Sequence, residues 1–77
     1  METLVHTTHH AIAGNDYEIL IFRRADGTHV AKTFFTPRDV IINDGISLEE
    51  ALSRHQRLLP LAVNSRELLY ATRRLSC

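Results

Sequence analysis

EILIFRRADGTHVAKTFF (residues 18–35) contains two apolar, β-rich runs separated by Asp26-Gly27. Asp-Gly between such runs is a strong hairpin signal, because both residue types tolerate the positive φ that a type I′ turn requires. A two-residue loop would fix the pairing of the two strands, with Ile21 opposite Lys32. This segment therefore predicts an antiparallel hairpin at the centre of the fold.

The segments before and after the hairpin extend it into an antiparallel meander. Residues 3–13 are rich in Thr, Val, Ile and His without helical periodicity, which predicts a first strand. The polar residues 14–16 favour a turn, and residues 17–24 and 28–35 form the next two strands. The length of the apolar run at residues 40–42 is compatible with a short fourth strand and with a buried connector, so both alternatives stay open.

The C-terminal part of the chain predicts two helices. Ser47 and Glu50 have the spacing of a capping box, and apolar residues then recur at helical spacing up to residue 59. Pro60 disfavours helical geometry in the residue before it, so we expect this helix to end there. Asn64 or Ser65 would cap a second helix. The predicted fold is a single α+β domain, residues 1–77, with a three- or four-stranded antiparallel sheet and two helices packed on one face.

The central strand is apolar on both of its faces, since Ile19-Leu20-Ile21-Phe22 has no polar residue. Two short helices cover one face of a small sheet, so the other face is open to a second protomer. The alternative is that the sheet curls and the rest of the chain covers both sides. We expect a homodimer that forms through a sheet face or an edge strand, and the predicted register gives Leu20, Phe22 and Phe35 as the interaction residues.

Composition restricts the function classes further. Nine Lys and Arg balance nine Asp and Glu, so no global positive field attracts nucleic acid. Cys77 is the only cysteine, and no apolar run reaches the length of a membrane span, which favours a cytoplasmic protein. The sequence has no nucleophile elbow and no glycine-rich phosphate loop. We therefore expect a non-enzymatic protein-interaction module without a cofactor.

Five histidines, His6, His9, His10, His29 and His55, raise the question of a metal site. On a strand, His6 and His10 share a face but lie roughly 13 Å apart, and His9 points to the other face. One zinc ion with ligands at about 2.0–2.1 Å cannot join them. We expect no metal site, and surface histidines on an edge strand instead.

The segment LAVNSRELLYATRRL (residues 61–75) resembles the turn and recognition helix of helix-turn-helix DNA-binding proteins. The resemblance covers about a fifth of the chain. It implies an alternative function as a nucleic-acid-binding regulator, in which a recognition helix reads bases and phosphates. The competing interpretation is an amphipathic helix packed on the sheet. The residues that the resemblance would place at nucleic acid are Ser65, Arg66, Tyr70, Arg73 and Arg74.

Overall fold

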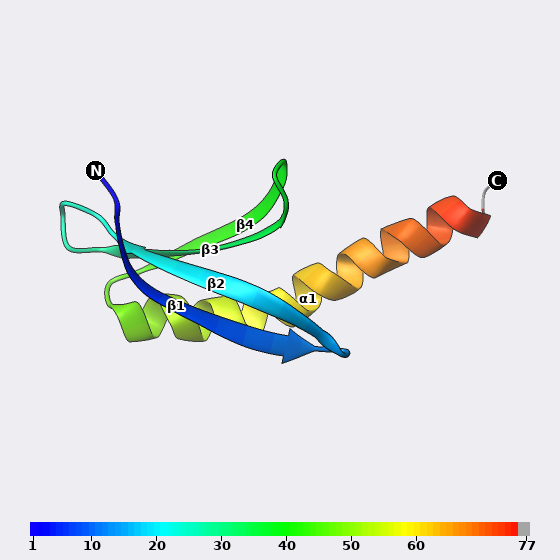
Figure 1. Ribbon diagram of the computed structural model, residues 1–77, viewed down its shortest axis with the longest axis horizontal. Coiled ribbons are helices and arrows are strands. Elements are labelled where there is room, and N and C mark those ends of the chain that lie inside the picture. The colour runs from blue at the N-terminus through cyan, green and yellow to red at the C-terminus, as the bar shows by residue number, and fades with distance from the viewer. Residues whose placement is uncertain (76–77) are drawn as a thin grey trace.

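A computed structural model describes the backbone of residues 1–75 and the side chains of residues 1–68. Four antiparallel strands precede one helix (Figure 1). The sheet has the order β1-β2-β3-β4, so each strand pairs with its neighbour in sequence, and β1 and β4 are the edges. The α+β class is thereby confirmed, and of the two alternatives for residues 40–42 the structure shows a fourth strand. The elements are β1 (Thr3–Ile12), β2 (Asn15–Arg23), β3 (His29–Thr36), β4 (Asp39–Gly45) and α1 (Leu48–Leu75).

Within residues 1–75, one helix is present where two were expected. Residues 61–63, which lie between the two predicted helices, are helical, and Pro60 lies inside α1. Pro60 and Gln56 are both exposed, so water can reach the Gln56 carbonyl that Pro60 leaves without its N–H partner. Leu59 and Val63 lie one turn apart, and both are buried. Their burial against the sheet favours continuing the helix through the proline.

The start of α1 agrees with the predicted N-cap at Ser47. The Glu50 amide donates to the Ser47 hydroxyl oxygen at 3.1 Å, and the Ala51 amide donates to the Ser47 carbonyl at 3.0 Å. The Glu50 carboxylate pairs with Arg54 at 2.6 Å, so it does not complete the capping box. Asn64 and Ser65, expected as caps of a second helix, lie within α1.

The first turn falls one residue earlier than predicted, at Ala13-Gly14. Ile12 pairs with Asn15, which leaves a two-residue loop. Both loop residues have positive φ, 52° for Ala13 and 82° for Gly14. A type I′ turn requires this geometry, and an alanine is unusual there because its Cβ is crowded in the left-handed region.

The second turn contains three residues instead of two. The Gly27 amide donates to the Arg24 carbonyl at 3.0 Å, and the Arg24 amide donates to the Thr28 carbonyl at 2.8 Å. Within this loop only Gly27 has positive φ, 90°. This is a turn followed by a left-handed glycine, the usual form of a three-residue hairpin loop. The extra residue shifts the pairing by one, so Ile21 lies opposite Ala31, not Lys32.

The one-residue shift exchanges the faces of β3 relative to β2. Phe35, expected beside Leu20 and Phe22, lies on the face that α1 covers. Phe34 lies on the opposite face, which we call the outer face. The central strand is apolar on both sides, as the sequence indicated: Ile19 and Ile21 are fully buried against the helix side, and Leu20 and Phe22 are half-buried on the outer face.

The hydrophobic core lies between the sheet and the first half of α1, which packs on β4, β3 and β2. Gly45 brings the end of β4 against the helix, since a Cβ there would lie 2.6 Å from the Ala51 amide nitrogen. Beyond the sheet, the C-terminal turns of α1 project away from the strands (Figure 1). The buried residues of this core cluster are Ile19, Ile21, Ala31, Ala51, Leu59 and Val63. Val30, which pairs with Phe22, is also buried.

A buried polar network joins α1 to the sheet. His55 is fully buried, with Nε2 2.7 Å from the Thr33 hydroxyl and Nδ1 against the Asn43 side-chain oxygen. The Asn43 amide nitrogen donates to the Ala51 carbonyl at 3.0 Å, and the Thr33 hydroxyl donates to the Glu18 carbonyl at 2.9 Å. Both ring nitrogens therefore face oxygen atoms, while burial of the ring lowers the pKa of His55 to about 4.

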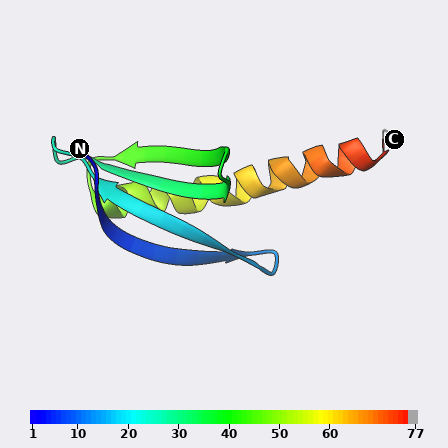
Figure 2. The ribbon, with the colours of Figure 1, turned by 45° about the horizontal axis from the view of Figure 1, so that its top comes forward.

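The sheet opens at one end. β2 pairs with β3 only from Leu20 to Arg23, whereas β1–β2 and β3–β4 pair over most of their length. Figure 2 shows the two hairpins diverging toward the β1–β2 and β3–β4 turns, with α1 passing between them in this view. The Thr33 hydroxyl bonds to the Glu18 carbonyl in this region, where no ladder bond joins the two strands.

Candidate functional site

The outer face of the sheet is the first candidate site, because α1 packs on the other side. Strand pairing places the side chains of β2, β3 and β4 in rows across this face. Phe34 and Ile42 are 52% and 55% exposed, although both are large apolar side chains. They lie beside the half-buried Leu20 on β2 and Val40 on β4, and Lys32 separates Leu20 from Ile42 in their shared row. We call this group the outer patch: Leu20, Phe34, Val40 and Ile42.

The other end of the outer face is covered by charged side chains of the same chain. The Glu2 carboxylate accepts from the Lys32 amine at 2.8 Å, and that amine lies 4.9 Å from the centre of the Phe22 ring. The hydrogen bond from Lys32 holds the pKa of Glu2 below its usual value. Arg24 lies between Glu2 and Asp44, 3.8 Å and 3.6 Å away respectively. Salt bridges therefore screen Phe22. The outer patch stays open on this face, as does Leu4, which pairs with Phe22 from β1 and is 51% exposed.

The three predicted interaction residues are thus separated by the structure. Leu20 belongs to the outer patch, Phe22 lies beneath Lys32, and Phe35 packs on the helix side. Sequence reasoning missed Phe34 and Ile42. The signal that could have found them is Ala25-Asp26-Gly27 read as a three-residue loop ending in glycine, which puts Phe34 on the outer face.

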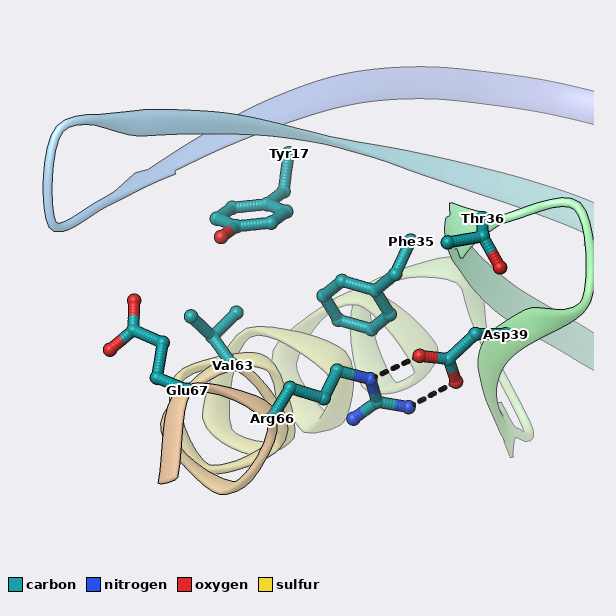
Figure 3. A pocket seen from close by; sticks show the side chains of 7 residues that line it. All are labelled: Tyr17, Phe35, Thr36, Asp39, Val63, Arg66 and Glu67. Atoms are coloured by element: carbon teal, nitrogen blue, oxygen red, sulfur yellow. Dashed lines mark hydrogen bonds and ion pairs between the residues drawn. The ribbon is translucent and has the colours of Figure 1, made fainter. Parts of the chain in front are cut away.

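A pocket on the helix side is the second candidate site (Figure 3). It lies where the two hairpins diverge and α1 passes below them. Its volume is about 250 Å³. Aromatic and aliphatic walls come from β2, β3 and α1, and charged side chains stand at the rim. The lining residues are Tyr17, Phe35, Thr36, Asp39, Val63, Arg66 and Glu67.

Arg66 closes one side of this pocket. Its Nε and Nη2 donate to the two oxygens of Asp39 at 2.6 Å each, and Nη1 donates to the Ala62 carbonyl at 3.0 Å. The hydrogen bonds from Arg66 hold the pKa of Asp39 below its usual value. The guanidinium carbon also lies 4.1 Å from the centre of the Phe35 ring. Phe35 in turn meets Tyr17 edge-on, with ring centres 5.7 Å apart.

The helix-turn-helix resemblance requires a turn before the recognition helix, but residues 61–63 are helical in the structure. Arg66, a proposed nucleic-acid contact, is directed to Asp39 and the Ala62 carbonyl. Ser65 is exposed. The side chains of Tyr70, Arg73 and Arg74 lie outside the described residues.

The histidines of β1 lie on an edge strand. His9 is on the outer-face side and bonds to Asp16 at 2.8 Å, while His6 and His10 are on the other side. Among the described residues, no three His, Cys, Asp or Glu side chains are grouped so that they could hold a metal ion. His29 has a buried Nδ1 without a hydrogen-bond partner among the described residues.

Comparison with protein-family models, curated proteins and solved structures gave no match to this chain. No helix within the described residues combines the length and apolarity of a membrane-spanning segment. The proposed function therefore depends on the fold and the two candidate sites.

Proposed function

We propose that this chain is a small non-enzymatic interaction module that forms a homodimer through the outer patch. The observation that supports the proposal is the exposure of Phe34 and Ile42 on a sheet face that α1 leaves open. Exposed large apolar side chains that adjoin one another are typical of protein-binding surfaces.

A second copy of the chain suits this surface for two reasons. Two sheets can pack face to face at about 10 Å, with their apolar rows interdigitated. The formal net charge of zero also means that two copies do not repel one another through their overall charge. A twofold arrangement would bring the same patch from each protomer into contact.

Sedimentation equilibrium over a concentration series tests the proposal. The expected result is a mass approaching twice the 8.8 kDa of the single chain as concentration rises. Ile42→Asp and Phe34→Asp should shift the equilibrium to the single chain, because dimer formation would then bury an unpaired charge.

Ile46→Asp is the matched control. Ile46 is 79% exposed and follows β4, outside the sheet, so its substitution should leave the dimer intact. A mass of 8.8 kDa at every concentration would contradict the proposal. Equal dissociation by Ile46→Asp would show that the outer patch is not the interface.

A further inference from the structure

The pocket between the hairpins and α1 is small and largely apolar in its walls. Its volume of about 250 Å³ is below the range of about 300–1,000 Å³ common for sites that take drug-sized ligands. Tyr17, Phe35 and Val63 supply the walls. A single ring or one extended side chain matches this space better than a larger cofactor does.

The charges at the rim are unequal. Asp39 and Arg66 neutralise each other through two hydrogen bonds. Glu67 is exposed and makes no hydrogen bond or ion pair with another described side chain. In Figure 3 its carboxylate lies on the opposite side of the pocket from the Asp39–Arg66 pair, on the same side as the Tyr17 hydroxyl. The charge left over at the rim is therefore negative.

The aromatic walls also favour a positive group. The faces of aromatic rings carry partial negative charge and attract cations within about 6 Å. Phe35 already holds the Arg66 guanidinium over its face at 4.1 Å. Tyr17 provides a second ring in the same pocket, nearer to the Glu67 side in Figure 3.

We propose that this pocket binds a protonated primary amine carried on a short apolar body. The ammonium group lies between the Glu67 carboxylate and the Tyr17 ring, and the apolar part lies against Phe35 and Val63. An anionic ligand is disfavoured, because the three guanidinium nitrogens of Arg66 already donate to Asp39 and the Ala62 carbonyl. Small arylalkylamines and lysine side chains both carry a protonated primary amine on an apolar body.

NMR titration of the full chain with benzylamine, benzyl alcohol and benzoate tests the proposal. Benzylamine, protonated at pH 7, should shift the methyl signals of Val63 saturably, with a dissociation constant of about 1 mM for so small a ligand. Benzyl alcohol, of the same shape but neutral, should bind about 5-fold more weakly, and benzoate weaker still. A blocked lysine, N-acetyl-lysine methylamide, distinguishes the two sources: binding at least as tight as benzylamine points to a lysine side chain.

Two variants in the pocket and one control variant locate the interaction. Glu67→Gln should weaken benzylamine binding about 5-fold and remove its preference over benzyl alcohol. Glu49→Gln, an exposed glutamate on the same helix away from the pocket, should leave binding unchanged. Tyr17→Leu keeps an apolar wall and should weaken the amine more than the alcohol.

Absence of a saturable shift with benzylamine would overturn the proposal, as would benzoate binding as tightly as the amine. Ile42→Asp separates this inference from the proposed dimer. It should abolish self-association and retain amine binding, because Ile42 lies on the outer face and does not line the pocket.

Discussion

Lowering the pH should destabilise this domain through His55. The ring is fully buried, and its burial lowers the pKa from 6.5 to about 4. The unfolded chain therefore binds a proton between these two values that the folded chain does not. His55 contributes stability that is fully present above pH 6.5, falls as the pH decreases toward about 4, and stays lost below that.

The magnitude follows from the shift in pKa. At 1.36 kcal/mol per unit, the difference between 6.5 and about 4 corresponds to about 3 kcal/mol. About 2 kcal/mol of this should be lost between about pH 7 and pH 5. A domain of this length is stable by roughly 4–12 kcal/mol, so the change is a large part of the total.

Urea unfolding at a series of pH values measures this loss. Glu2, Asp26 and Asp39 also have lowered pKa values, but they release their stabilisation below about pH 4.5, outside the interval between about pH 7 and 5 in which His55 is tested. His55→Gln should remove the pH dependence between about pH 7 and 5. His9→Gln, at an exposed histidine on β1, should retain it.

The hydrogen-bond network around His55 favours the charged ring, which opposes the effect of burial, and the experiment decides which effect is larger. A charged His55 would donate from Nε2 to the Thr33 hydroxyl and from Nδ1 to the Asn43 oxygen. If this gain exceeded the desolvation penalty, His55 would titrate at or above 6.5 in the folded protein. NMR titration of the ring showing such a value would refute the reasoning, as would an unchanged pH dependence in His55→Gln.

Three backbone predictions can be checked by thermal unfolding. Ala13→Asn should raise the melting temperature by several degrees, because Asn tolerates the positive φ of this turn and stabilises the fold by about 1 kcal/mol. The control Ala11→Asn, in the strand, should not raise it. An unchanged melting temperature for Ala13→Asn would contradict the turn assignment. Gly45→Ala should destabilise by at least about 1–3 kcal/mol because its Cβ meets helix backbone, and Ile46→Ala should change stability little; equal effects would argue against that close contact. Pro60→Ala should increase helix content and stabilise the folded protein by about 1 kcal/mol or more, because alanine restores the missing N–H donor. A lower melting temperature for this variant would show that Pro60 stabilises the continuous helix.

Much of the fold could be predicted from local sequence. The β-rich runs, the Gly-containing turns and the Ser47 cap each depend on residues close in the chain, and the structure contains the strands and the cap. The predicted length of the loop before Thr28 was wrong. Asp-Gly is compatible with both a two-residue and a three-residue loop, and the choice depends on how the strands pair with the rest of the sheet. That single residue decided which of Phe34 and Phe35 would face the helix.

The continuous helix could not be predicted for a related reason. Pro60 is unfavourable for a helix when considered alone, and only tertiary contact offsets this cost. Leu59 and Val63 are buried by strands distant from them in sequence. The pocket depends on the same packing, because Tyr17, Phe35 and Arg66 come together only when α1 continues past the proline.

The order of the strands has a consequence for how this chain folds. Every strand pairs with its sequence neighbour, so the sheet forms by closing loops of only a few residues. Short loops lose little chain entropy on closure, and low contact order is associated with fast folding. The sheet can thus assemble before α1 docks, and the edges of β2 and β3 spend little time unpaired despite the small core.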